Sequence, residues 1–249
     1  MMASSAKKAK VDSKRMPNWL ELPIDLTKNI LQRLDTIEIV TSANVCPLWW
    51  NICKDPLMWR TINMSGFQIR QYDFSCLEKI CRCAIDLSRG HLEDIDISFF
   101  GTDDLLEYMA HRASYLRRLR LFRCREISNK GFSEFVKKFS LLEDLDISFN
   151  ILTKDTIVTI GQCCPFLKSL NLERIRSSDC ECDGQAFAIA KTMPGLCRLK
   201  LTRIVLLNIT LFAIIEGCPL LESLDVKECH RLYLMWKLEE TYAKDDWKY

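Results

Sequence analysis

The apolar residues of this chain recur in a fixed pattern along most of its length. A leucine is followed three positions later by Leu or Ile, and two positions after that by Leu, Ile or Val. The pattern begins at Leu92, Leu116, Leu142, Leu167, Leu196 and Leu221. Apolar and polar residues alternate over each short span, which predicts a β-strand with one buried face.

Helical patterns fill the spaces between these segments, whose starts lie 24 to 29 residues apart. We expect helices over residues 105–113, 132–139, 156–162, 187–192 and 211–216. Pro165, Pro194 and Pro219 follow three of them, where proline ends a helix and turns the chain into the next strand. A unit of this length, built from a strand and a return helix, is typical of leucine-rich repeats, which stack to bury one continuous core.

The predicted fold is therefore α/β: a leucine-rich-repeat solenoid of parallel strands and return helices, preceded by a small all-helical segment. We assign about six repeats to residues 61–249, and a weaker strand of the same spacing includes Ile62 and Met64. The last residues, 232–249, are expected to cap the open end of the array. Residues 17–60 form the helical segment, and residues 1–16 form a basic tail that we expect to be disordered.

Residues 17–60 carry a helical pattern instead of the repeat. An amphipathic helix is predicted after Leu22 and Pro23. Asp35 and Glu38 have the spacing of a capping box, which predicts a second helix that continues through Val45. Pro47 is expected to break or kink the chain beyond that helix. Three short helices bury little surface, so we expect this segment to be stabilised by packing against the solenoid, against a partner, or against both.

The helical segment resembles an F-box. The resemblance is carried by Leu22, Pro23, Ile30, Leu31, Leu34, Val45, Cys46, Trp49, Asp55, Pro56 and Trp59. With the cysteine-containing repeats behind it, the chain resembles plant F-box/leucine-rich-repeat proteins from residue 17 onward. Many F-boxes have Lys or Arg where this chain has Pro47, and a basic residue is common where it has Trp50.

The resemblance implies a non-catalytic adaptor, the substrate-recognition subunit of a Skp–cullin–F-box ubiquitin ligase. The F-box would dock on the Skp adaptor and, through it, on the cullin–RING ligase, while the repeats would bind a protein substrate. Matching positions imply a docking surface of Leu22, Pro23, Leu26, Ile30, Leu31, Leu34, Val45, Cys46 and Trp49. Ile30, Val45 and Trp49 have a second interpretation, as the core of the small helical segment. The alternative function is a ligase-independent repeat scaffold in which the F-box-like segment is only a cap.

The net charge and hydropathy of the chain limit the classes of partner that we expect it to bind. Lys and Arg number 35 and Asp and Glu 33, a net charge of +2 that argues against nucleic acid as the partner. The most apolar stretch, residues 204–215, would reach only about 18 Å as a helix, so no membrane span is expected. We expect no cofactor. The basic tail is either a solvated arm or a nuclear-localisation signal, and the expected location is the nucleus, the cytoplasm or both.

No secretory signal precedes the thirteen cysteines, and most of them are expected to be free, buried thiols. Cys124, Cys164, Cys218 and Cys229 occupy recurring repeat positions that suit a small buried side chain. Cys180 and Cys182 are the best metal candidates, but no His or second Cys pair lies nearby in the sequence. We therefore predict no metal site and interpret their loop as a partner contact. No catalytic constellation appears.

The polar residues of the predicted strands should face the concave side of the solenoid. At the two outward positions they read Asp94, Arg118, Asp144, Ser169, Arg198, Ser223 and Asp96, Arg120, Asp146, Asn171, Lys200, Asp225. In the first three repeats the signs alternate. This pattern fits a self-neutralising ladder, which we favour there, or a charged groove for a polar peptide.

Arginines exceed what such a ladder needs. The predicted substrate-binding residues are Arg118, Arg120, Phe122, Arg123, Phe149, Arg174, Arg198 and Lys200. Arginine pairs with carboxylate and phosphate groups through two parallel hydrogen bonds. The sequence therefore predicts an acidic or phosphorylated peptide as the ligand, with the two phenylalanines as exposed anchors.

Overall fold

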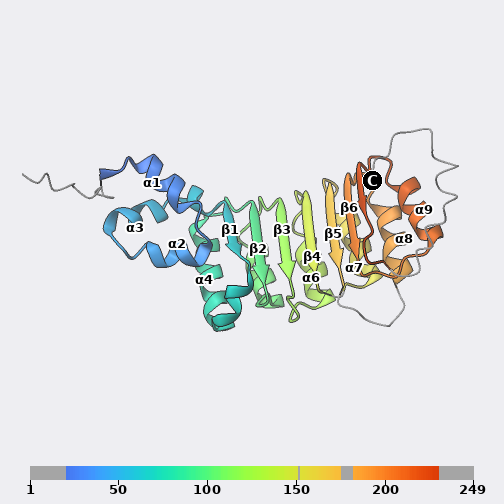
Figure 1. Cartoon of the computed structure of the whole chain (residues 1–249), viewed down its shortest axis with the longest axis horizontal. Helices are drawn as coiled ribbons and strands as arrows, with labels where there is room; N and C mark the ends of the chain where they lie inside the picture. Colours follow the sequence, from blue (N-terminus) through green and yellow to red (C-terminus); the bar gives the residue numbers. More distant parts are fainter. Residues whose placement is uncertain (1–20, 151, 175–181, 230–249) are drawn as a thin grey trace, which may run out of the picture.

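The computed structural model describes residues 21–150, 152–174 and 182–229. The helical segment comes first and consists of α1 (Ile24–Leu31), α2 (Thr36–Ser42), α3 (Pro47–Cys53) and the 3-10 helix η2 (Pro56–Trp59). It lies at one end of an elongated molecule whose remainder is a single row of strands and helices (Figure 1). The basic tail 1–16 and the predicted cap 232–249 lie outside the described residues.

The strands form one parallel sheet in which each strand pairs with the next along the chain. They are β1 (Thr61–Met64), β2 (Asp94–Ser98), β3 (Arg118–Phe122), β4 (Asp144–Ser148), β5 (Ser169–Glu173), β6 (Arg198–Thr202) and β7 (Ser223–Asp225). All six predicted strands are confirmed, and β1 confirms the weaker one.

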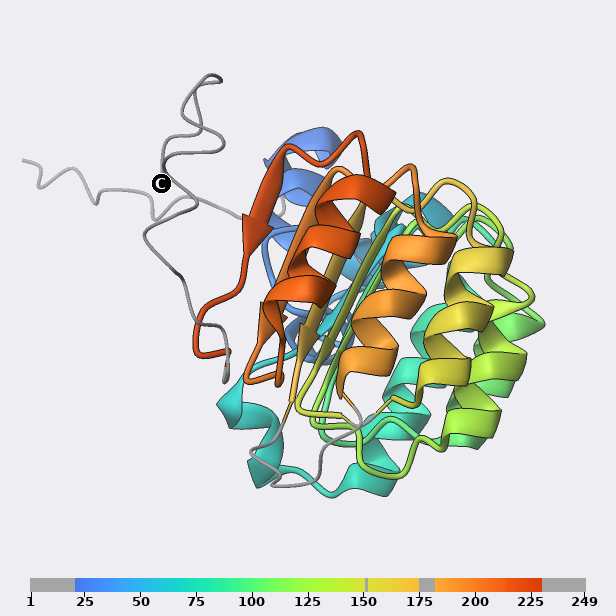
Figure 2. The same cartoon turned by 90° about the vertical axis from the view of Figure 1, so that its right-hand side faces the viewer.

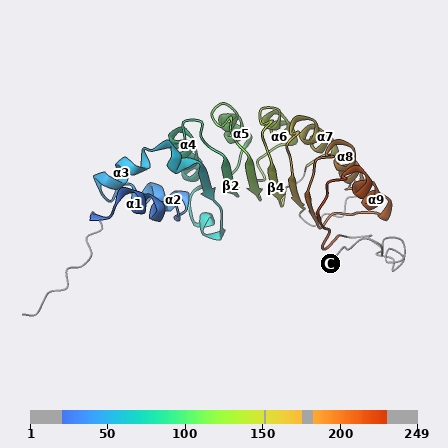
Figure 3. The ribbon, with the colours of Figure 1, turned by 90° about the horizontal axis from the view of Figure 1, so that it is seen from above.

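Helices α4 to α9 cover one face of this sheet (Figure 2). They are α4 (Phe74–Leu87), α5 (Asp103–Ala110), α6 (Asn129–Val136), α7 (Lys154–Cys163), α8 (Cys182–Thr192) and α9 (Asn208–Gly217). The short 3-10 helix η3 (Phe67–Gln71) precedes α4 and lies on the strand side (Figure 3). Seen from above, α4 to α9 form the outer side of an arc and the strands its inner side (Figure 3). The fold is the predicted leucine-rich-repeat solenoid, preceded by the small helical segment that resembles an F-box. Within the described ranges, no helix is long and apolar enough to cross a membrane.

The core is a column of side chains from matched strand positions. Ile95, Leu119, Leu145, Leu170 and Leu199 are aligned by the strand register and are all buried. Burying one such side chain contributes about 1.5–3 kcal/mol. A single strand has nothing to bury it against, so only the stacked array gains this free energy.

All five predicted repeat helices begin earlier in the structure than the apolar pattern predicts: α8 by five residues, α9 by three, and α5, α6 and α7 by two or three. Helices α5, α6 and α7 are capped by Thr102, Ser128 and Thr153, whose side chains accept hydrogen bonds from backbone N–H groups of the first turn. The predicted starts of these three helices are two or three residues late because an apolar pattern does not record these polar caps.

The F-box helices both confirm and correct the sequence analysis. The Asp35 carboxylate accepts a 2.8 Å hydrogen bond from the Glu38 N–H, and the Glu38 carboxylate accepts one of 3.0 Å from the Asp35 N–H, as predicted. Helix α2 ends at Ser42, however, so Val45 lies in the turn beyond it. The prediction that Pro47 breaks the chain is wrong, because Pro47 occupies the first position of α3, where a helix needs no N–H donor.

The F-box and the first repeat share one hydrophobic core. Helix α2 packs on β1 and α4, and Trp59 and Ile62 belong to the same buried cluster as the repeat leucines. The buried hydroxyl of Thr36 in α2 accepts a 2.9 Å hydrogen bond from the Asn63 N–H in β1. The helical segment therefore packs against the solenoid and is stabilised by it.

Candidate functional site

The first helix of the F-box leaves a row of apolar side chains on the surface. Leu26 and Ile30 are four residues apart in α1 and so lie on one helical face, and Leu22 comes just before the helix begins. Together with Asn29 and Arg33 they line a shallow hollow. Leu26 is 51% exposed and Ile30 40% exposed, so α1 does not use this face to build its own core.

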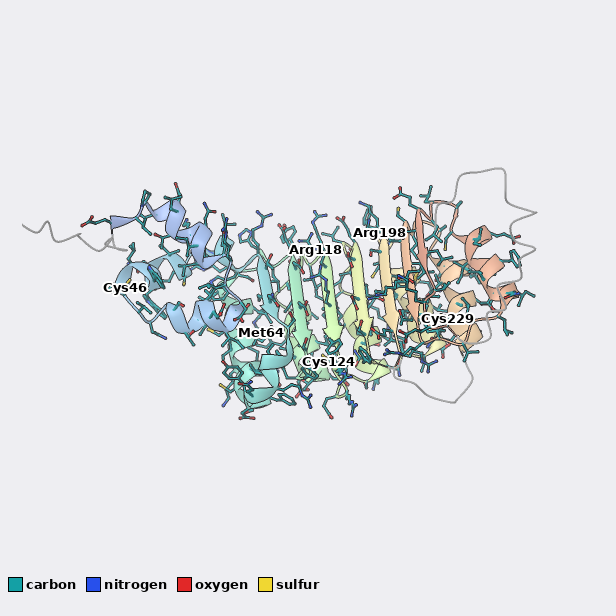
Figure 4. All side chains as sticks on the ribbon, in the orientation of Figure 1. Cys46, Met64, Arg118, Cys124, Arg198 and Cys229 are labelled. Atoms are coloured by element: carbon teal, nitrogen blue, oxygen red, sulfur yellow. The ribbon has the colours of Figure 1, made fainter. Side chains whose placement is uncertain are left out.

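The turn into α3 extends this apolar surface. Pro23 is exposed at the start of α1, and Val45 is 69% exposed before α3. Cys46 caps α3, since its sulfur accepts a hydrogen bond from the Trp49 N–H. Trp49 is half-buried and packs against the core. Figure 4 shows Cys46 at the end of the F-box far from the repeats.

Not every residue predicted for docking lies on the surface. Leu31 is fully buried in the core, so it supports α1 from inside and its assignment as a contact residue is corrected. Leu34 is half-buried against the same core. The core interpretation of Ile30 and Val45 is wrong, because both side chains are exposed.

The concave face carries the two predicted rows of polar residues. The strand register aligns Asp94, Arg118 and Asp144 in one row and Asp96, Arg120 and Asp146 in the next. Both rows continue across β5, β6 and β7, as predicted. Figure 4 shows Arg118 and Arg198 at the amino-terminal ends of their strands.

The arginines of β3 form ion pairs with carboxylates on the neighbouring strand β2. The Arg118 Nε donates a 2.8 Å hydrogen bond to Asp94, which raises the pKa of the guanidinium. A guanidinium nitrogen of Arg120 lies 3.9 Å from carboxylate oxygens of both Asp94 and Asp96. The two arginines are thus paired as in the ladder that the alternation of signs favoured, while Asp144 and Asp146 form no ion pair with a described residue.

The other end of the face is basic. Arg198 and Lys200 on β6 are exposed, and neither forms an ion pair with a described residue. They lie three strands away from Arg118 and Arg120, so the structure separates the predicted basic residues into two groups.

The carboxyl ends of the strands carry a stack of aromatic rings. The ring centroids of Phe99 and Phe122 lie 5.4 Å apart, and those of Phe122 and Phe149 lie 5.0 Å apart, both edge to face. The Arg123 guanidinium lies over Phe122 and Phe149, at 5.5 and 4.7 Å from the ring centroids. The two predicted anchors are therefore half-buried against each other and are not free surface rings.

Left-handed backbone conformations place this stack. Residues directly after the strands have positive φ, namely Phe99, Arg123, Phe149 and Arg203. Arg203 joins the stack over Phe149 and also binds Glu173 at 3.0 Å and Glu228 at 2.8 Å. Arg174 takes the corresponding place after β5 and is half-buried.

A cavity of about 280 Å³ lies where β2, β3 and β4 end on the concave face. Its lining includes Asp96, Ser98, Phe99, Arg120, Phe122 and Asp146. Burial raises the pKa of the Asp96 carboxyl to about 6, an effect that Arg120 opposes and that Asp146 and Asp94 reinforce. Burial also raises the pKa of Asp144 on the neighbouring row.

The repeat cysteines are structural. Cys124, Cys164 and Cys218 are buried, and Cys229 is half-buried, as expected for small side chains in a tight turn. The Cys124 thiol donates to the Ile97 carbonyl oxygen at 3.6 Å, and the Cys229 thiol donates to the Leu201 carbonyl oxygen at 3.2 Å. Both bonds therefore reach back into an earlier repeat.

The two cysteines predicted as metal candidates cannot be compared with the structure. Cys180 and the side chain of Cys182 lie outside the described residues. Among the residues described, no group of three or more His, Cys, Asp or Glu side chains is placed to hold a metal ion.

Comparison with known proteins supports the assignment of both the helical segment and the repeats. The F-box domain family matches residues 19–61. The F-box protein SKIP19 of Arabidopsis thaliana is 43% identical over 242 residues, which are 96% of this chain and 79% of that protein. The chain belongs to the plant F-box/LRR-repeat family. Arabidopsis F-box/LRR-repeat protein 22 is 44% identical over 89% of this chain and 73% of its own length.

A further F-box/LRR-repeat relative, Arabidopsis protein 23, is 42% identical over 91% of this chain, but the match spans only 51% of that protein. Among solved structures, the tropomodulin C-terminal domain from Caenorhabditis elegans aligns with 80% of this chain and 93% of its own at 11% identity. Its TM-score of 0.38 is too low to carry an argument.

The sequence analysis of this F-box/LRR-repeat protein missed two features. The exposed Ile24 and Trp50 extend the apolar surface of the F-box, although neither was among the predicted docking residues. The cavity at the strand ends was also missed. Its only sequence signal is that Asp96 and Asp146 recur at the same position of two repeats, while Phe99 and Phe149 each follow three residues later.

Proposed function

We propose that this F-box/LRR-repeat protein is the substrate-recognition subunit of a Skp–cullin–F-box ubiquitin ligase. The observation that carries the proposal is the exposed pair of Leu26 and Ile30 on α1, with the half-buried Leu22 just before the helix, beside a segment whose core is already filled by other side chains. Apolar side chains that a small domain leaves on its surface mark an interaction site.

The chain is non-catalytic in this proposal. It would bind the Skp adaptor through the F-box and a protein substrate through the concave face of the repeats. Holding both together raises the effective concentration of a substrate lysine near the ubiquitin that other subunits transfer.

Co-purification with a purified Skp adaptor tests the docking surface. The Leu26→Asp/Ile30→Asp variant is expected to weaken adaptor binding at least tenfold, because it places two charges on the apolar row. Ile209→Asp/Ile215→Asp is the matched control, since these exposed isoleucines lie on α9 at the other end of the molecule. Unchanged circular dichroism shows that both variants remain folded.

A ligase-independent scaffold is the second candidate. The contact that favours it is the packing of α2 against β1 and α4, because a helical segment that covers the first strand can act as a cap. A folded wild-type chain that does not bind the adaptor would support the scaffold. Binding that the α1 variant loses and the α9 variant keeps would exclude it.

The location of the protein in the nucleus or cytoplasm remains a prediction from the basic tail. The absence of nucleic-acid and membrane partners is also a prediction. A fluorescent fusion with and without residues 1–16 tests the first, since loss of nuclear signal on deletion would assign a targeting role to the tail.

A further inference from the structure

We infer that the cavity at the carboxyl ends of β2, β3 and β4 binds a lysine or arginine side chain of the substrate protein. This inference rests on the proposed function and assigns it a substrate chemistry. It differs from the acidic peptide that the arginine-rich sequence suggested.

The position of the cavity suits an extended peptide on the concave face. Its lining comes from three neighbouring strands and from Ser65 and Gly66, which lead from β1 towards η3. The η3 segment projects on the strand side of the arc (Figures 2 and 3), and its Arg70 lies over the Phe99 ring at 5.5 Å. The cavity is thus bounded towards the F-box and continues onto the open sheet beyond β4.

Carboxylates exceed cations among the residues that line the cavity. Asp96 and Asp146 line it with a single guanidinium, that of Arg120, which lies between two carboxylates at 3.9 Å. Asp146 accepts hydrogen bonds of 2.6 Å from Ser148 and 2.8 Å from Asn171 but forms no ion pair with a described residue.

The neighbouring row adds to this excess. Arg118 is bound to Asp94, while Asp144 forms no ion pair within the described part of the chain. On β2, β3 and β4, the two rows together hold four aspartates and two arginines. A bound cation would restore the balance, whereas a phosphate would meet the carboxylates of Asp96 and Asp146.

The cavity also offers a hydroxyl group. Ser98 lines the cavity. A serine oxygen can accept a hydrogen bond, so it can receive one from the N–H donors of a lysine or arginine head.

The aromatic walls suit the rest of such a side chain. Phe99 and Phe122 meet edge to face and flank the carboxylates. Lysine and arginine pack their apolar stems on such rings while the charged head remains near the carboxylates. The same rings already hold Arg70 and Arg123 at 5.5 Å, so cations are compatible with this stack.

Peptide selection tests the inference. A random dodecapeptide phage library is selected on the full-length protein, with and without the Skp adaptor bound. The wild type is expected to enrich peptides that share one lysine or arginine. Calorimetry then compares a selected peptide with the same peptide in which that residue is glutamine, which should bind at least tenfold more weakly.

Matched variants assign the peptide to the cavity. Asp96→Asn/Asp146→Asn is expected to weaken the selected peptide at least tenfold. Glu107→Gln/Glu216→Gln removes the same charge from exposed positions of α5 and α9 on the outer side of the arc, and should change affinity less than twofold.

Two results would overturn the inference: selected peptides without a basic residue, or binding that Asp96→Asn/Asp146→Asn leaves intact. Adaptor binding is measured on the same preparations. If the wild type selects basic peptides but does not bind the adaptor, the proposed ligase role fails and the inference about the cavity stands.

Discussion

The indole N–H of Trp59 donates a 2.7 Å hydrogen bond to the backbone carbonyl oxygen of Cys53. Trp59 ends η2 just before β1, and Cys53 ends α3, so the bond holds the end of the F-box, where the chain enters the first repeat, against α3. Trp59 is 1% exposed and lies in the core that both parts share. The orientation of the F-box relative to the sheet therefore depends on a buried side chain and not on a flexible linker.

Replacement of Trp59 should destabilise the folded protein. Trp59→Leu is expected to lower the free energy of unfolding by about 3–5 kcal/mol, because it leaves a cavity and removes the donor to Cys53. Urea unfolding followed by circular dichroism measures the change. Trp50→Leu is the control, since Trp50 is half exposed and its loss should cost less than about 1 kcal/mol. Equal effects of the two substitutions would contradict the shared core.

Gly217 permits the close approach of two helices. A Cβ atom at Gly217 in α9 would lie 2.2 Å from the backbone oxygen of Ala190 in α8. Alanine normally stabilises a helix by about 1 kcal/mol relative to glycine, but here Gly217→Ala should destabilise by about 1–3 kcal/mol. A thermal melt measures the sign. Gly195→Ala, whose nearest contact would be 3.9 Å away, should leave the melting temperature nearly unchanged.

The Asp96 carboxyl should make stability depend on pH. Its pKa in the folded protein is about 6, above its ordinary value of 3.8, so the folded state holds the proton more tightly. The stabilising effect of that proton is complete below about pH 4 and is lost as pH rises through 6. Asp96→Asn should therefore raise the free energy of unfolding by about 1–3 kcal/mol at pH 7.5, and this gain should shrink towards pH 4. Urea titrations at both pH values measure the difference, and a gain independent of pH would be inconsistent with this explanation.

The cysteines of α4 should differ sharply in reactivity. Cys76 and Cys83 are exposed, whereas Cys81 is buried and its pKa is raised to about 12 by burial. Because the thiolate is the reactive form, iodoacetamide at pH 8 should label Cys81 at least 100-fold more slowly than its two neighbours. Peptide mass spectrometry reads the three rates. In urea all three should react alike, and rapid labelling of native Cys81 would refute the burial argument.

The repeat fold could be predicted from the sequence because its signal is both periodic and local. The positions that face the core, such as Leu119 and Leu145, and those that face outward, such as Arg118 and Asp144, follow from alternation alone. Stacking at a constant period then fixes which residues become neighbours. Helix starts were less accurate, since Thr102 and Thr153 act through a single hydrogen bond that an apolar pattern does not record.

The candidate sites depended on geometry that spacing does not contain. Leu31 and Ile30 are adjacent in the sequence, yet one is buried and the other exposed, because helix α1 packs one side on the core. From the sequence alone, the arginines of β3 predict a binding site for an anion. Their partners Asp94 and Asp96 lie 24 residues earlier in the register and neutralise them. A count of charges along the chain does not show which charges pair across strands.

The position of the cavity among the repeats bears on how family members can differ in length. It lies on β2 to β4, next to the F-box, while β5 to β7 continue beyond it. In a solenoid each repeat contacts only its neighbours, so repeats gained or lost at the far end leave the spacing between F-box and cavity unchanged. The distal repeats of such proteins can therefore vary without a change in the distance between the cavity and helix α1.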